Sequence, residues 1–597
     1  MILQALCDYY TRLREAGDTD IAPPGWVRKP VDYVVVLDAD GKAMRMEPRY
    51  ELERGKRKAG RAELLPSIGK QSQKHTNSGD DANLLWDNSG FALGYGKDGQ
   101  KKLESFLAAI ATWFPDGPTS LNALNTFLRA HLAGRSGLDS LLPNDADRDA
   151  LASGAPIITF QLVDDGGLLL CQREDVSQRY DRARMAESAG PRGACLVTDA
   201  IDVAIELNET VIKRVYGGQS SGKNIVSFNE RAFESYGKTK RGGENAPISK
   251  SASFSYTTAL NHLLREGSRN RMQVGDASTV FWASRPSILE TAIPDLFGES
   301  PIDDPDRGVV AVEALYKAID SGRLAGPEGD ARFFVLGLAP NAARIAVRFC
   351  HVATVAEIGN RIRDWFDDLR IVRSPSDLEF PALKRLLAAI CMPTKERSGG
   401  DIERLPPSIA GDLVRSILNG AVLPIPLLNA AIHRCRADQA RKTETGTPVP
   451  NVNYHRAALL KACINRLIQR GQLNGKEIAV ALDPDNTEPA YLAGRLFATY
   501  ERVQSDAAGR DLNRTIRDTY FGAAMSNPAT VFPRLIQLNQ HHLRDMKRSK
   551  PGLYVVRDRL IAEIWNKFPA DRLLPLCLPL AERARFALGY YHQRQGL

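Results

Sequence analysis

The chain has 597 residues, 43% apolar and 25% charged, so it is long enough for roughly two to four packed units and too apolar for a disordered protein. Lysine and arginine outnumber aspartate and glutamate by 79 to 71, and the resulting charge of +8 suits a polyanionic partner without identifying one. No run of about 20 apolar residues occurs, which argues against a membrane-spanning helix and predicts a cytoplasmic protein.

The first third of the chain carries strand signals on either side of a helix. A β-branched run at 33–37 ends in Asp40 and Gly41, which predicts a hairpin. The run at 157–163 is followed by a turn of two aspartates and two glycines before the run at 168–171, which predicts another. Between them, apolar residues share one helical face: Leu103, Phe106, Leu107, Ile110, Trp113 and Phe114.

A hairpin and a capped helix are predicted in the middle of the chain. Runs at 333–338 and 345–349 pair across Pro340 and Asn341. Thr354 and Glu357 then have the spacing of a capping box, which marks a helix start. The inward face of this helix is expected to carry Ile358, Ile362, Trp365 and Phe366.

After about residue 380 the strand signals vanish. One helical stripe, made by Leu413, Val414, Ile417 and Leu418, ends near Gly420. A helix at 454–469 is closed by Gly471, and a polar linker at about 474–486 precedes a helix with Thr487 as its cap and Pro489 in its first turn.

These signals predict an α+β N-terminal region of mixed sheets and helices, followed by an all-α C-terminal helical bundle. The expected boundaries are 1–380 for an α+β region, 381–474 for a helical region, and 475–597 for a C-terminal bundle.

The eight cysteines are too widely spaced to form a Cys-x-x-Cys pair, so they are interpreted as small buried hydrophobic residues in a reducing compartment. The first ten residues lack the basic segment and the apolar run of a secretion signal, which also favours a cytoplasmic protein.

Three basic clusters are candidates for contact with nucleic acid, because a phosphate backbone is bound by clustered lysine and arginine. The first lies at 42–74, with ten basic and four acidic residues, and adjoins a polar loop whose amides suit base edges. Its candidate residues are Gln71, Gln73, Lys74 and Asn77. The alternative is a solvated charged loop.

The second cluster surrounds the glycine-rich segment 217–222, where small residues let the backbone approach a phosphate. Its basic residues are Lys213, Arg214, Lys223, Lys238, Lys240 and Arg241, and its polar candidates are Gln219, Ser220 and Asn224. The alternative is a plain mobile loop.

The third cluster begins at His542 and holds eleven basic and five acidic residues. Its candidates are Arg544, Lys547, Arg548 and Lys550, which would follow a single strand by its backbone while Tyr554 or Trp565 stacks on bases. The alternative is a helix surface that is basic for solubility alone.

Catalytic patterns are incomplete. Residues 217–223 nearly match a phosphate-binding loop, but Asn224 stands where a serine or threonine would hold magnesium. Residues 224–228 are also predicted to form a strand, where such a loop needs a helix. Paired aspartates fit turns or helix ends, and the histidines lack ligand spacing, so neither a metal nor a cofactor is expected. A metal- or nucleotide-dependent enzyme acting on nucleic acid stays open as the alternative function.

Several ordered segments resemble the Csd-type large subunit of type I-C CRISPR Cascade, an RNA-guided surveillance complex. They are MILQAL at the start, IAPPGW (21–26), SFNERAFESYG (227–237), NAPIS (245–249), YTTALN (256–261) and LGLAPNAAR (336–344). The resemblance runs from one end of the chain to the other.

The resemblance implies a non-catalytic subunit that recognises the protospacer-adjacent motif in double-stranded DNA, promotes R-loop formation and stabilises the displaced strand. Implied partners are the guide RNA, the backbone, guide-processing and small subunits, and a recruited helicase-nuclease. Motif readers of such complexes use small-residue loops with a glutamine or lysine, which makes Gln219, Ser220 and Lys223 the main candidates. The segment 1–380 would be the DNA-recognition region, and the segment 475–597 would resemble a small subunit. A scaffold for the other subunits or the guide RNA is a further hypothesis.

Overall fold

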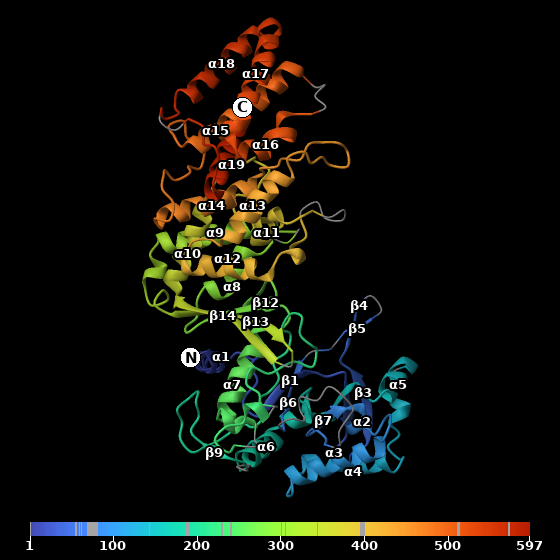
Figure 1. The fold of residues 1–597 in the computed structure, drawn as a ribbon. Coiled ribbons are helices and arrows are strands. Elements are labelled where there is room, and N and C mark those ends of the chain that lie inside the picture. The colour runs from blue at the N-terminus through green and yellow to red at the C-terminus, as the bar shows by residue number, and fades with distance from the viewer. Residues whose placement is uncertain are drawn as a thin grey trace. The chain divides into compact units, whose positions relative to one another are not determined.

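The computed structural model describes residues 2–53, 56–58, 60, 62–68, 81–142, 144–186, 190–228, 231–238, 242–299, 301, 303–304, 306–342, 344–393, 400–509, 514–570 and 573–596 (Figure 1). The chain divides into two compact units. Unit 1 comprises residues 1–268 and the short segment 339–346, and unit 2 comprises residues 269–338 and 347–597.

Unit 1 is a mixture of short strands and helices. Its elements are α1 (Ile2–Glu15), β1 (Trp26–Pro30), β2 (Tyr33–Leu37), β3 (Ala43–Pro48), β4 (Glu51–Glu53), β5 (Lys56–Lys58), β6 (Ala62–Pro66), β7 (Trp86–Asn88), α2 (Ser89–Ala92), α3 (Gly99–Trp113), α4 (Ser120–Leu132), α5 (Asp145–Ala152), β8 (Ile157–Leu162), α6 (Glu174–Ala186), β9 (Arg192–Gly193), β10 (Val203–Ala204) and α7 (Lys250–Leu263).

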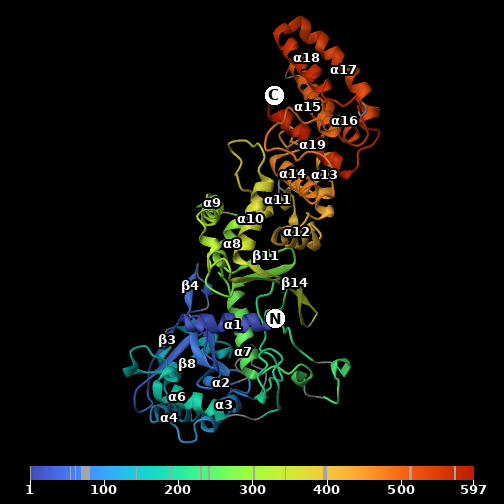
Figure 2. The same ribbon diagram turned by 90° about the vertical axis from the view of Figure 1, so that its left-hand side faces the viewer.

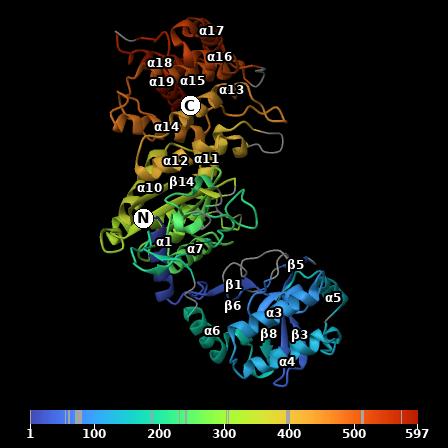
Figure 3. The same cartoon turned by 60° about the horizontal axis from the view of Figure 1, so that its bottom comes forward.

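The main sheet of unit 1 has the strand order β3-β2-β8-β7. Its central strands β2 and β8 are parallel, and Tyr33 stands opposite Ile158. Every residue of β2 is buried, which explains why this strand is an unbroken apolar run rather than an alternating one. Helices α3 and α4 lie next to this sheet (Figure 3). They pack on it through Phe106 and Phe127, whose ring centroids lie 6.1 and 6.2 Å from that of Phe160.

The remaining strands of unit 1 form three two-stranded ladders, β1 with β6, β4 with β5, and β9 with β10. Beyond them, α7 packs against α1, where the rings of Tyr10 and Phe254 meet edge to face at 6.0 Å. Helix α7 carries the side chains that hold the candidate site described below.

Unit 2 combines one sheet with a large helical region. Its elements are β11 (Arg271–Val274), β12 (Ala277–Ala283), α8 (Leu289–Phe297), α9 (Arg307–Asp320), β13 (Arg332–Asn341), β14 (Arg344–Thr354), α10 (Val355–Leu369), α11 (Leu383–Ile390), α12 (Pro407–Asn419), α13 (Ile425–Ala437), α14 (Tyr454–Gln469), α15 (Pro489–Ala508), α16 (Ile516–Ser526), α17 (Pro528–Ser549), α18 (Pro551–Trp565) and α19 (Leu580–Gln595). The tip of the β13–β14 hairpin is the segment assigned to unit 1.

The sheet of unit 2 is an antiparallel meander, β11-β12-β13-β14. Helix α10 follows directly, and its capping box is formed as predicted: the Glu357 amide donates to Thr354 Oγ1 at 3.1 Å, and the Thr354 amide donates to Glu357 Oε2 at 2.9 Å. One continuous apolar core extends from this sheet through the helices. Figure 2 shows α17 and α18 side by side within unit 2.

The predicted fold class is confirmed, with mixed sheets and helices first and a largely helical C-terminal region. The last strand is β14 among the described residues, apart from an isolated bridge between Lys442 and Pro448. The helix at 454–469 has the bounds that the sequence predicts, and Gly420 follows α12 in the left-handed region at φ 62°. The three-part division at 380 and 474 stays a prediction.

Three local predictions were wrong. Residues 168–171 do not form a second hairpin strand, because β8 pairs with β2 and β7 and leaves only a single bridge between Gln161 and Leu169. The residue that caps α15 is Glu488 rather than Thr487, although Pro489 does open the helix. Residues 224–228, expected as a strand, form one bridge at Asn224 and then bends.

No helix among the described residues is long and apolar enough to cross a membrane.

Candidate nucleic-acid interface

The second basic cluster is built around an ordered loop, residues 212–223, which we name the glycine loop. Its two ends pair with each other: the Ile212 amide donates to the Lys223 carbonyl at 2.8 Å, and the Lys223 amide donates back at 2.9 Å. Gly217 and Gly222 adopt φ angles of 71° and 86°, in the region that side chains disfavour. The two glycines therefore allow the backbone to turn sharply within the loop.

A half-buried carboxylate, that of Glu209, supports the segment that follows the loop. Glu209 accepts hydrogen bonds from the amides of Ile225 at 2.7 Å and Val226 at 3.1 Å, and from the hydroxyl of Tyr256 on α7. Burial raises the pKa of Glu209, and these donors oppose that shift. Because three donors converge on one carboxylate, the segment after the loop is fixed to α7.

A second side chain of α7 holds the first residues of the loop. Asn261 Oδ1 accepts from the Lys213 amide at 2.9 Å, and its Nδ2 donates to the Val211 carbonyl at 3.1 Å. The amide thus takes the place of a strand partner on one side of the loop. Neither Glu209 nor Asn261 was identified from the sequence as part of the site, because nothing in their local pattern refers to residues about 50 positions away.

The tip of the β13–β14 hairpin, which belongs to unit 1, flanks the other side of the loop. The Lys223 ammonium donates to the Ala342 carbonyl, and the Ile345 amide donates to the Asn224 carbonyl at 2.9 Å. Asn224 Nδ2 also donates to the Glu209 carbonyl at 2.8 Å. Two predicted contact residues, Lys223 and Asn224, are therefore engaged in holding the loop.

Two polar side chains of the loop take no part in these supporting contacts. Gln219 and Ser220 are exposed, and within the described part of the chain their side chains form no hydrogen bond, although the Gln219 carbonyl accepts from the Gly222 amide at 3.0 Å. An exposed amide and hydroxyl on a fixed backbone can donate to, and accept from, the edge of a base.

Cationic side chains gather at the base of the loop. Burial, reinforced by the neighbouring Arg214, lowers the pKa of Lys213 to about 8. Burial and the charge of Lys213 lower the pKa of Lys29, on β1, to about 8, while Asp87 opposes the shift. Lys29 lies over the ring of Trp86 at 4.7 Å. Lys29 was not among the residues predicted from the sequence, because it lies far from the loop along the chain.

Other predicted residues of this cluster differ in their surroundings. Lys238 donates through Nζ to the Glu244 carbonyl at 2.8 Å, so its ammonium has a hydrogen-bond partner within the protein. Lys240 and Arg241 lie outside the described residues. The same holds for Gln71, Gln73, Lys74 and Asn77 of the first cluster, whose role stays a prediction.

The third cluster lies where α17 ends and α18 begins. Arg544, Lys547, Arg548 and Lys550 are all exposed there. In the described part of the chain Arg544 and Arg548 have no ion-pair partner, whereas Lys550 donates to the Asp506 carbonyl at 2.5 Å. Arg557 does not share this face, because it is buried and pairs with Asp506 at 2.9 Å.

The two aromatic residues of the third cluster, Tyr554 and Trp565, differ in whether a base could stack on them. Trp565 Nε1 donates to the Tyr500 hydroxyl at 3.1 Å, and its ring packs on Phe568 at 5.1 Å, so it belongs to the helical core. Tyr554 is half-buried and has the Lys547 ammonium 5.8 Å from its ring centre. Of the two, Tyr554 is the better placed to meet a base.

The near-match to a phosphate-binding loop does not lead into a helix. After Lys223 and Asn224 the described chain makes bends, whereas such a loop needs a helix N-terminus to receive the phosphates. In the described residues, no three histidine, cysteine, aspartate or glutamate side chains gather as a metal ion would require.

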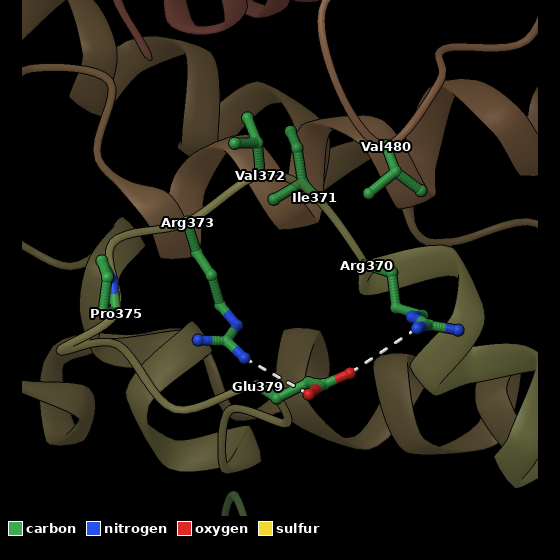
Figure 4. Close-up of a pocket in the computed structure, with 7 residues that line it drawn as sticks. All are labelled: Arg370, Ile371, Val372, Arg373, Pro375, Glu379 and Val480. Atoms are coloured by element: carbon green, nitrogen blue, oxygen red, sulfur yellow. Dashed lines mark hydrogen bonds and ion pairs between the residues drawn. The ribbon is translucent and has the colours of Figure 1, made fainter.

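A separate pocket in unit 2, of about 450 Å³, lies where α10 ends (Figure 4). Arg370 and Arg373 each form an ion pair with Glu379, with nitrogen–oxygen distances of 3.7 and 3.2 Å, and the lining also includes Ile371 and Val480. Because the arginines already have carboxylate partners, this pocket presents less positive charge than the glycine loop.

A model of the CRISPR-associated protein family Cas_Csd1 matches residues 6–597. The chain belongs to the Cas_Csd1 family. No curated protein matches it. Within this Cas_Csd1 protein, the matched residues include the glycine loop, the hairpin tip and the basic end of α17, so all three features are part of the family domain.

Proposed function

We propose that this protein is the non-catalytic large subunit of a type I-C CRISPR RNA-guided surveillance complex, and that it recognises the protospacer-adjacent motif in double-stranded DNA. The observation that carries the proposal is the glycine loop: a fixed backbone that exposes Gln219 and Ser220 above the cationic residues Lys213 and Arg214. An amide and a hydroxyl form hydrogen bonds with base edges, and cationic side chains neutralise phosphates.

The roles within the site divide by chemistry. Gln219 and Ser220 contact base edges, and Lys213 and Arg214 neutralise phosphates beside them. Lys223 and Asn224 position the loop through Ala342 and Ile345. A loop held on both sides loses little conformational entropy when it meets DNA, which favours binding.

Opening of the DNA then needs only modest contacts. The RNA–DNA hybrid that forms is about as stable as the duplex that is lost, so R-loop formation is nearly balanced in free energy. Motif contacts at the glycine loop favour the first step, and Arg544, Lys547, Arg548 and Lys550 stabilise the displaced strand by its backbone. The guide RNA, the backbone, guide-processing and small subunits, and a recruited helicase-nuclease are the partners of this role.

The direct test measures DNA binding by the assembled complex against a library of protospacer-adjacent sequences. The double variant Gln219→Ala and Ser220→Ala should lose discrimination among motifs by about 1–3 kcal/mol while the complex still assembles. Gln100→Ala is the control, because Gln100 is an exposed glutamine on α3 of the same unit. Unchanged discrimination in the double variant would refute the assignment, and failed assembly would favour a scaffold role.

A second test addresses the alternative, a metal- or nucleotide-dependent enzyme. The purified protein is incubated with ATP, magnesium or manganese, and labelled DNA or RNA. We expect neither nucleotide hydrolysis nor strand cleavage. Robust turnover that copurifies with the chain would overturn the non-catalytic role.

A further inference from the structure

An exposed aromatic residue near the glycine loop ends the short 3-10 turn Arg231–Phe233. Phe233 retains 40% of its surface exposure, and the Arg344 guanidinium lies over its ring at 4.2 Å from the centre. Arg344 comes from the hairpin tip, which the Lys223 and Asn224 contacts already fix to the loop. The ring is therefore held in place while part of it faces solvent.

A second exposed aromatic residue borders the same tip. Tyr216 is 48% exposed and immediately precedes Gly217, where a Cβ atom added to the glycine would lie 3.6 Å from Pro340 Cγ of the hairpin. Phe233 and Tyr216 thus border the tip at Arg344 and Pro340 respectively. Exposed aromatic rings beside cationic side chains are the combination with which proteins bind single-stranded nucleic acid.

We infer that Phe233 and Arg344 form a stacking site for an unpaired nucleobase beside the glycine loop, with Tyr216 as its neighbour. This inference rests on the proposed function and adds a second substrate, single-stranded DNA, at the same place. A base stacks on aromatic and guanidinium planes whatever its identity. A duplex cannot use the site because its bases already stack on one another.

Charge complementarity selects a nucleic acid over an apolar protein segment as the occupant. Lys213 and Arg214 lie in the same loop as Tyr216, and Arg344 is itself part of the stacking pair. An apolar peptide would have to desolvate these cations, whereas a nucleotide brings a phosphate to them. The site therefore provides a planar surface on which the base stacks, and positive charge that binds the phosphate of the same nucleotide.

The experiment uses the assembled complex and a forked DNA. The DNA carries the motif in its duplex part and 2-aminopurine at the first unpaired position, and its fluorescence falls when the base stacks. The wild type should quench this signal. Phe233→Leu keeps the apolar volume but removes the ring, so we expect loss of quenching and about tenfold weaker binding of the fork. Binding of a fully paired motif duplex should not change.

Two further variants distinguish stacking from a structural role. Phe233→Trp restores an aromatic plane and should restore quenching. Arg348→Ala should behave as wild type, because Arg348 lies on the same hairpin but pairs with Asp276 at 2.8 Å. If Phe233→Leu quenches like the wild type, the inference is wrong. If it weakens duplex and fork binding equally and lowers the melting temperature, the pair only fastens the hairpin tip and the inference is again wrong.

The outcomes for the two proposals are separable. A wild-type complex without motif preference, but with quenching that depends on Phe233, would refute motif recognition and support the stacking site. A complex with motif preference and quenching independent of Phe233 would do the reverse.

Discussion

The ammonium of Lys223 donates a hydrogen bond to the backbone carbonyl of Ala342, 119 residues further along the chain. This contact joins the glycine loop to the hairpin tip, so Lys223 stabilises the position of the loop. A lysine that positions a loop and a lysine that neutralises a phosphate differ in one measurable respect, which is the salt dependence of DNA binding.

Replacing Lys223 by methionine should weaken motif-duplex binding without changing the slope of log Kd against log salt concentration, because no phosphate contact is lost. Replacing Lys213 by methionine should lower that slope by about 0.9, as expected for one phosphate contact. Both are measured by fluorescence anisotropy titrations at several salt concentrations. A reduced slope in Lys223→Met would show that Lys223 itself contacts a phosphate.

DNA binding should weaken as pH rises through about 8. The pKa of Lys213 is lowered to about 8 by burial and by Arg214, so this lysine is charged below that pH and loses its proton above it. Only the protonated form attracts phosphate. Titrations at pH 7 and pH 9 should show a weaker salt dependence at pH 9 in the wild type. In Lys213→Arg, which stays charged at both pH values, the salt dependence should differ less between pH 7 and pH 9. If the difference is as large as in the wild type, Lys213 is not the group that loses the proton.

Replacing Asp438 by asparagine should lower the free energy of unfolding by about 3–5 kcal/mol, because it leaves buried arginines without their carboxylate. Only 3% of the Asp438 side chain is exposed, and it pairs with Arg434 and with Arg456 at 2.5 Å. Chemical denaturation followed by circular dichroism measures the loss.

The control for this prediction is Asp412→Asn. Asp412 pairs with Arg415 at 3.2 Å on an exposed surface of α12, where both side chains are 48% exposed, so the expected change is below about 1 kcal/mol. Equal losses of unfolding free energy in the two variants would contradict the stabilising role assigned to Asp438.

Reversing the charge of Arg544 and Arg548 to glutamate should weaken binding of single-stranded DNA and reduce its salt dependence, while the melting temperature stays near that of the wild type. Arg557→Ala should lower the melting temperature and leave single-strand binding unchanged, because Arg557 is buried and pairs with Asp506. Single-strand titrations and thermal unfolding check the pair. Normal single-strand binding by the glutamate variant would remove the third cluster from the proposed interface.

The sequence by itself determined the elements whose signals are local. Thr354 and Glu357 predicted the capping box of α10, and the periodicity of 454–469 with Gly471 predicted α14, because caps and helical faces depend on residues within a few positions of each other. The clustering of lysines and glycines around 217–222 likewise identified the loop, and the order of several motifs indicated the family.

Tertiary structure alone decided what each residue of that loop does. Whether Lys223 faces solvent or Ala342, whether Lys29 joins Lys213, and whether Phe233 lies beneath Arg344 depend on segments that are distant in the chain. Pairing across such separations is set by the packing of the whole unit, which a local pattern does not contain. Charge and composition therefore indicated where in the chain to look for a nucleic-acid interface, and the fold shows which contacts the residues of this candidate interface make within the protein.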